Sequence, residues 1–161
     1  RITEGLAALL AGYKPVWVVS QWNHPAELTD ESLKAVSYLV DRGIPVLNQS
    51  VLLKGINDDL RTLGELFHGL VRMRVKPYYL FQGDLAKGTA HFRTNLRFGI
   101  ALADELRGKI SGLAMPAFAV DLPGGGGKVL LSSGSIQREE NGFFVISGRD
   151  GKEYLYPNEP Q

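Results

Sequence analysis

Ile44-Pro-Val-Leu-Asn-Gln-Ser-Val-Leu-Leu53 is a mostly apolar run with the length of one buried strand. The preceding segment, Thr29 to Gly43, carries apolar residues at helical spacing behind a capping threonine. The following segment can be capped by Asn57-Asp-Asp59 and is helix-like to about Met73. Strands separated by helices of ten or more residues cannot be hairpin partners. We therefore expect this strand to lie parallel to its neighbours in an α/β fold, joined by right-handed crossovers.

The same alternation of helix and strand extends to both sides of this stretch. It predicts four helices and four parallel strands in all, and it places the candidate fold among α/β proteins. The further predicted helices cover Ile2–Tyr13 and Thr94–Arg107, and the further strands cover Val16–Ser20, Lys76–Phe81 and Pro116–Val120.

The pattern changes after Lys128. Short strand-like pieces follow, separated by Ser-Gly, Glu-Asn-Gly and Arg-Asp-Gly turns. We expect residues 1–127 to form the α/β part and residues 128–161 to form a small antiparallel β appendage. The pieces are Val129–Leu131, Ser135–Arg138, Phe143–Ile146 and Glu153–Tyr156.

The composition is that of an ordinary globular domain. The 161 residues are 44% hydrophobic and 22% charged, and the net charge is +1. No basic stripe indicates nucleic acid, and no membrane span or signal peptide is visible, so we expect a cytoplasmic protein without membrane contact. The chain has no cysteine, which excludes disulfides and any cysteine-ligated metal within it. Because it begins at Arg1, directly before a helix, we expect it to be part of a longer protein.

Polar residues follow each of the four predicted strands. In parallel sheets the carboxyl ends of strands share one edge, where ligands bind, so these side chains are candidates for a common site. Each residue type is also common in loops, and any one of them alone could be a cap. The residues are Ser20, Gln21, Asn48, Gln49, Gln82, Asp84 and Asp121.

Asp121-Leu-Pro-Gly-Gly-Gly-Gly-Lys128 leaves four glycines of bare backbone next to one amine. Glycine allows backbone to approach a ligand closely, and a lysine amine can form a Schiff base with an aldehyde. The stretch is not a P-loop, because Leu122 and Val129 occupy positions that require Gly and Ser or Thr. On turn chemistry alone, a flexible turn between two strands is the favoured explanation of the run.

Five stretches together resemble the lysine 2,3-aminomutase family, whose members are radical S-adenosylmethionine enzymes that also use pyridoxal phosphate. The resemblance runs over nearly the whole chain in order. It implies the C-terminal half of a partial (β/α) barrel of the TIM type. The stretches are Gln21–Pro25, Leu47–Leu53, Pro77–Leu85, Gly88–Thr94 and Val120–Lys128.

The resemblance implies a role for each candidate residue. Lys128 would hold pyridoxal 5'-phosphate as a Schiff base, with Gly124, Gly125, Gly126 and Gly127 close to the cofactor. Asp84 and Asp121 would bind the ε-ammonium of substrate lysine, which favours lysine over an acidic substrate. Gln49 and Gln21 would contact S-adenosylmethionine.

The chain also departs from the family pattern. Gln21 stands where the type enzyme has a histidine, Phe81 replaces a tyrosine, and Asp59 stands where some members place a zinc cysteine. The CxxxCxxC motif of the [4Fe-4S] cluster and the arginines for cofactor phosphate and substrate carboxylate are missing. In the family these lie upstream of the position matching Arg1, so we expect no metal ligands in this chain.

The implied activity is radical 2,3-amino migration from L-α-lysine to L-β-lysine in a complete, homo-oligomeric enzyme. By itself the chain, without the missing N-terminal half, is expected to be inactive. Two alternatives remain open at this stage. One is the family branch that acts on a lysine of elongation factor P, and the other is a non-catalytic half-barrel serving as a binding module.

Overall fold

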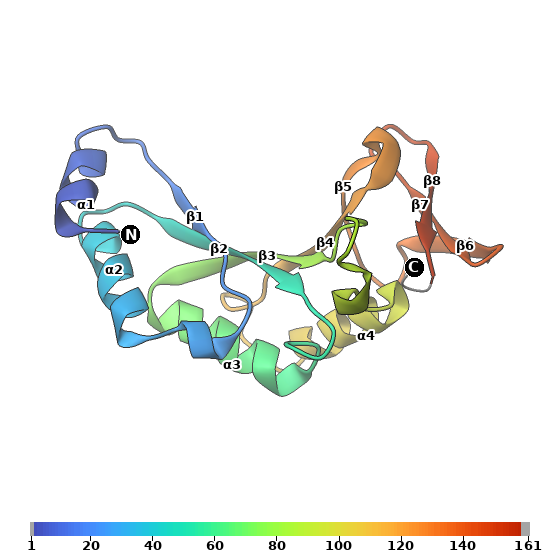
Figure 1. Ribbon diagram of the computed structural model, residues 1–161, viewed down its shortest axis with the longest axis horizontal. Coiled ribbons are helices and arrows are strands. Elements are labelled where there is room, and N and C mark those ends of the chain that lie inside the picture. Colours follow the sequence, from blue (N-terminus) through green and yellow to red (C-terminus); the bar gives the residue numbers. More distant parts are fainter. Residues whose placement is uncertain (1, 159–161) are drawn as a thin grey trace.

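The computed structural model describes residues 2–158, which form a five-stranded sheet, four α-helices and a separate three-stranded sheet (Figure 1). The main sheet has the strand order β1-β2-β3-β4-β5. Its first four strands are parallel, as the sequence predicts, and β5 is antiparallel to β4. These strands are β1 (Val18–Ser20), β2 (Val46–Leu52), β3 (Val75–Gln82), β4 (Ala117–Leu122) and β5 (Gly127–Leu130).

The four helices all lie on one face of the main sheet (Figure 1). Each begins at a capping side chain that accepts a backbone N–H of the first turn, namely Thr3, Thr29, Asp59 and Asn95. The helices are α1 (Glu4–Ala11), α2 (Asp30–Val40), α3 (Leu60–Arg72) and α4 (Leu96–Arg107), and single 3₁₀ turns lie at Pro25–Glu27, Ala90–Phe92 and Pro123–Gly125. The predicted order of helices and strands is therefore confirmed.

The two faces of the sheet differ because side chains alternate along each strand. In β2, Val46, Asn48, Ser50 and Leu52 are buried on the face that the helices cover, and the residues between them are partly exposed on the opposite, open face. The core lies between sheet and helices, with Leu63, Leu66, Phe67 and Leu70 of α3 fully buried. No helix covers the open face within residues 2–158 (Figure 1).

The second sheet consists of β6 (Ile136–Glu140), β7 (Phe143–Ser147) and β8 (Glu153–Pro157), paired antiparallel. An antiparallel C-terminal unit is what the sequence predicts. The Tyr156 hydroxyl donates to the carbonyl of Gly83 at 3.1 Å, which ties β8 to the end of β3. Burial raises the pKa of Tyr156, so its hydroxyl stays protonated as a donor.

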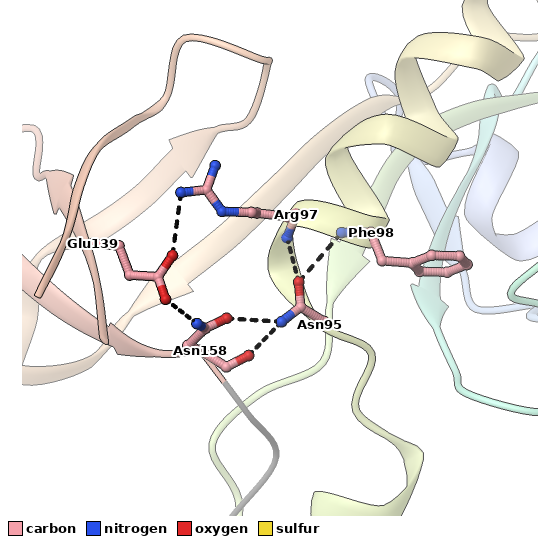
Figure 2. A network of polar contacts seen from close by, with 5 residues as sticks. All are labelled: Asn95, Arg97, Phe98, Glu139 and Asn158. Atoms are coloured by element: carbon pink, nitrogen blue, oxygen red, sulfur yellow. Dashed lines mark hydrogen bonds and ion pairs between the residues drawn. The ribbon is translucent and has the colours of Figure 1, made fainter. Parts of the chain in front are cut away.

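A polar network joins the second sheet to the start of α4 (Figure 2). The Asn95 side chain caps α4 through the N–H of Arg97 and donates to both oxygens of Asn158. Glu139 of β6 accepts from Asn158 and from Arg97, which is the second residue of α4. The network links three segments that are far apart in the sequence, and it fixes the second sheet against the helix.

The structure differs from the expectation for Val129–Leu131. We expected this piece in the appendage, but β5 pairs with β4 in the main sheet, with Leu122 opposite Gly127 and Asp121 opposite Lys128. The reason is the glycine run, in which Gly124, Gly125 and Gly127 have φ of 64°, 88° and 74° and turn the chain sharply back. The expected boundary at residues 127/128 therefore falls inside β5.

Two further findings concern residues 2–158 only. None of their helices combines the length and the apolar character that a membrane crossing requires. No three His, Cys, Asp or Glu side chains among them are grouped so that they could hold a metal ion.

Candidate functional site

A cavity of about 270 Å³ lies on the open face, at the carboxyl ends of the parallel strands. It brings together six of the polar or charged residues that the sequence singled out, from five different strands or the loops that follow them. The described lining consists of Gln21, Gln49, Val51, Phe81, Gln82, Asp84, Asp121 and Lys128.

Lys128 and Asp121 form an ion pair at the edge of this cavity. They are opposite each other in the β4–β5 register, so both side chains project from the open face. Lys128 Nζ lies 3.0 Å from each carboxylate oxygen of Asp121. The two side chains are 33% and 49% exposed, so ligands can reach both. In this state the carboxylate holds the amine in the site.

An aromatic wall supports the Lys128 side chain. Nζ lies 3.8 Å from the centre of the Phe81 ring and 5.2 Å from that of Tyr79. The two rings are 5.0 Å apart and inclined by 30°. A hydrogen bond with Tyr78, and then burial, raise the pKa of Tyr79, which keeps its hydroxyl protonated. A flat conjugated ligand attached to Lys128 would meet ring surfaces on this side.

The charges around the cavity are not balanced. Asp84, in the exposed loop after β3, and Asp121 contribute two carboxylates, and Lys128 contributes one ammonium group. Gln21 and Gln49 add uncharged amides. With one negative charge in excess among its described lining, the cavity favours a ligand that carries a cation.

The other strand-end amides have structural roles. Asn48 is fully buried, accepts from Ser20 Oγ and Trp22 N–H, and donates to the Trp22 carbonyl and Ser50 Oγ. The Gln82 side chain is buried and bonded to Thr94 just before α4. Our expectation that all strand-end polar residues share one site is therefore wrong for Asn48, because neighbouring residues of a strand point to opposite faces.

The glycine run shapes the turn beside the cavity. None of its four glycines occurs among the described residues that line this cavity. A Cβ on Gly126 would lie 2.8 Å from Leu122 Cβ and 2.9 Å from the Tyr154 ring, so only glycine fits there. That the four glycines lie close to a cofactor remains a prediction.

Lys76 is another lysine of the main sheet, but its amine is held away from the cavity. It lies near the amino end of β3, and its Nζ donates to the carbonyls of Leu113 and Met115 at 2.7 and 3.2 Å. Burial lowers the pKa of Lys76. The two carbonyls, however, hold its amine at the edge of the sheet opposite to the cavity.

Lys128 also lines a second cavity, of about 400 Å³. It contains Arg149, which lies in the turn between β7 and β8 and which the sequence analysis missed. No motif marks this arginine. Only the folding of the second sheet brings it to within reach of Lys128.

These features define a class: an α/β chain whose open sheet face presents an amine, two carboxylates and two amides at the carboxyl ends of its strands. A radical SAM methyltransferase from Sphaerobacter thermophilus has a similar fold, with a TM-score of 0.52 over 74% of this chain and 38% of that one, at 16% sequence identity. This likeness concerns the fold alone.

Sequence comparison gives the family. A family model described as lysine-2,3-aminomutase matches residues 103–151. The chain is 50% identical to L-lysine 2,3-aminomutase of Clostridium subterminale over 94% of its length and 36% of the relative, and 42% identical to that of Bacillus subtilis over 100% and 34%. It is also 39% identical to glutamate 2,3-aminomutase of Clostridioides difficile over 99% and 38%. The chain belongs to the lysine 2,3-aminomutase family, and it spans little more than a third of the length of these curated relatives.

Proposed function

We propose that this chain is the C-terminal part of an enzyme that converts L-α-lysine to L-β-lysine by radical 2,3-amino migration. The observation that carries the proposal is the cavity that joins Lys128, Asp121 and Asp84. The names of the relatives support the same reaction. Because the chain has no cysteine, the ligands of an iron–sulfur cluster would come from the rest of the protein.

The site fits a pyridoxal 5'-phosphate cofactor. Lys128 is partly exposed, lines two cavities and lies against the Phe81 ring, which suits an aldehyde on a flat aromatic ring. Lys128 would hold the cofactor through its aldehyde, and Asp121, which pairs with the Lys128 ammonium, could accept the proton that the amine has to lose. When bound, pyridoxal phosphate would delocalise an unpaired electron, while S-adenosylmethionine and a [4Fe-4S] cluster would supply the initiating radical.

When the cofactor binds to Lys128, Asp121 would exchange its ion-pair partner. In the structure it holds the Lys128 ammonium with both oxygens. Once the Lys128 amine is engaged by the cofactor, this carboxylate and Asp84 become available to a cation of the substrate. Two carboxylates that converge on one ammonium form charge-assisted hydrogen bonds, which anchor the far end of a lysine molecule.

The same pair of acids would select the substrate. A relative of this chain is named glutamate 2,3-aminomutase. A glutamate side chain in this cavity would place a third carboxylate beside Asp84 and Asp121, which costs free energy through like-charge repulsion. Gln49 and Gln21 also belong to the described lining and can donate amide hydrogens to the carboxylate of S-adenosylmethionine.

We also propose that the open face is the inner wall of a partial (β/α) barrel. Val19 and Leu130 on this face are 51% and 60% exposed, although Val19 lies in a parallel strand of a type that is usually covered on both faces. The remaining strands would belong to the part of the protein that this chain does not span. The second sheet, β6–β8, would form the appendage next to the site.

The test is turnover by the full-length protein that contains this chain, under anaerobic conditions with S-adenosylmethionine, pyridoxal 5'-phosphate and a reductant. We expect β-lysine from free L-lysine, detected by NMR, and no turnover in Lys128→Ala. Turnover of glutamate in preference to lysine would contradict the proposed role of the acids. Turnover of only a peptide-bound lysine would favour the branch that acts on elongation factor P.

A further inference from the structure

The loop that carries Asp84 connects β3 to α4. The Asp84 side chain is exposed and belongs to the lining of two cavities, the one at Lys128 and one of about 220 Å³ lined mainly by residues of this loop. Within residues 2–158, no ion pair includes the Asp84 carboxylate. The position of this carboxylate therefore depends on the backbone of the loop.

Gly83 lies directly before Asp84 and is held by a side chain of the second sheet. Glycine has more accessible backbone conformations than any other residue, so the chain could leave Gly83 in many directions. The Gly83 carbonyl and the Asp84 N–H belong to one planar peptide unit. Because the Tyr156 hydroxyl donates to this carbonyl at 3.1 Å, it also fixes the direction in which the chain continues to Asp84.

The Tyr156 side chain is itself firmly packed. It is 1% exposed, and in the β7–β8 register it lies opposite Phe144, which is fully buried. Burial, and to a smaller extent the negative charge of Asp84, raise the pKa of Tyr156, so its hydroxyl remains a donor. The Asp84 carboxylate thus lies within electrostatic reach of the hydroxyl that holds the preceding carbonyl.

The second sheet also holds the other end of the loop. Asn158, two residues after Tyr156, accepts from the Asn95 amide with its backbone and side-chain oxygens (Figure 2). Asn95 is the cap of α4, where the loop ends. The Gln82 amide donates to the Thr94 carbonyl at 2.6 Å and so joins the two ends of the loop directly. One short segment of the second sheet therefore contacts the loop at both ends.

We propose that Tyr156 is a positioning residue for substrate specificity: through the Gly83 carbonyl, its hydroxyl holds Asp84 where that carboxylate binds the ε-ammonium of lysine. The inference rests on the proposed function, in which Asp84 and Asp121 bind this cation. Tyr156 does not belong to the described lining of the cavity, so it acts on the substrate only through Asp84. The second sheet thereby contributes to substrate selection from outside the main sheet.

The experiment compares two ligands of the cofactor-loaded, full-length protein that contains this chain. L-lysine carries the ε-ammonium, and L-norleucine has the same carbon chain without it. Affinities for both are measured by calorimetry. We expect Tyr156→Phe to weaken lysine binding by roughly threefold to tenfold, the value of one hydrogen bond, and to leave norleucine and pyridoxal 5'-phosphate unchanged. A contact that only stabilised the fold would affect both amino acids alike.

Asp84→Asn tests whether the effect passes through Asp84. In this variant the preference for lysine over norleucine is already reduced, so adding Tyr156→Phe should weaken lysine binding much less than it does in the unmodified protein. The departure from additivity measures the coupling between the two residues. Tyr154→Phe is the matched control, because it removes the same hydroxyl two residues away in β8, where that hydroxyl donates to Asp150. It should change the affinity for neither ligand.

The outcomes separate this inference from the proposed function. The positioning role is refuted, while the proposed function stands, if Tyr156→Phe leaves lysine binding unchanged or weakens lysine and norleucine equally. The same holds if its effect persists in full in Asp84→Asn or if Tyr154→Phe has an equal effect. If Asp84→Asn itself leaves the preference for lysine over norleucine unchanged, the proposed role of Asp84 fails, and the positioning role fails with it.

Discussion

The two faces of the main sheet carry different kinds of side chain on the same strands. The covered face presents Leu52, Leu80 and Phe118, all nearly inaccessible, to the helices. The open face presents Gln49, Phe81 and Lys128 to the two cavities. Since successive residues of a strand alternate between faces, folding stability and chemistry are encoded at adjacent positions. Substituting one residue of a strand and, separately, its neighbour can therefore distinguish an effect on folding stability from an effect on the chemistry of the site.

Two phenylalanines on adjoining strands give the largest expected difference in stability. Phe118 of β4 is 1% exposed and packs against Gly99 of α4, whereas Phe81 of β3 faces the cavity. We expect Phe118→Ala to lower the free energy of unfolding by about 3–5 kcal/mol, the usual cost of removing a buried aromatic ring. Phe81→Ala should cost about 1 kcal/mol, because its ring is already partly exposed.

Urea denaturation of both variants measures this difference. Equal losses would show that the open face contributes to stability as much as the covered face does, and would contradict a core that lies only between the sheet and the helices.

The adjacent amides of β2 give a smaller difference of the same kind. Asn48→Ala would remove four hydrogen bonds and leave the Trp22 N–H without its partner, although Ser50 Oγ would still donate to the Trp22 carbonyl; we expect a cost of about 2–4 kcal/mol. Gln49→Ala should change stability by less than about 0.5 kcal/mol and should weaken binding of S-adenosylmethionine. Thermal unfolding and ligand titration report the two effects, and a destabilised Gln49→Ala with unchanged ligand binding would reverse the assignment.

The smallest effect on stability is expected for the two acids. Asp84 and Asp121 are exposed, so Asp84→Asn and Asp121→Asn should leave the melting temperature nearly unchanged. Each should weaken lysine binding by roughly tenfold or more, through loss of a charged hydrogen bond, and should affect the cofactor much less. Glu105→Gln is a suitable control, because Glu105 is an exposed acid on α4 that pairs only locally with Lys109. Equal losses for lysine and cofactor would contradict a role in substrate binding.

Much of the fold follows from local patterns. Apolar spacing and capping residues place the helices, and the helices between strands make the first four strands parallel. The place of β5 could not be predicted in this way, because it depends on the positive φ angles of Gly124, Gly125 and Gly127. Glycine permits such angles but does not require them.

The residues of the candidate site could likewise be predicted only in part from the sequence. Gln49, Asp84, Asp121 and Lys128 were identified from strand ends and family resemblance, and one cavity contains them all. Alternation along β2 could have separated Gln49 from Asn48, since the buried positions of that strand are the even-numbered ones. Arg149 could not be found from the sequence, because it reaches Lys128 only through packing of Tyr154 between Gly126 and Gly148.

The most direct test of this account is the identity of the lysine that holds the cofactor. The protein is incubated with pyridoxal 5'-phosphate, reduced with borohydride and digested, and the labelled residue is identified by mass spectrometry. We predict a single label on Lys128, which lies at both cavities, and no label on Lys76, whose amine two carbonyls hold at the opposite edge. A label on Lys76 or Lys87 in place of Lys128 would contradict the central claim.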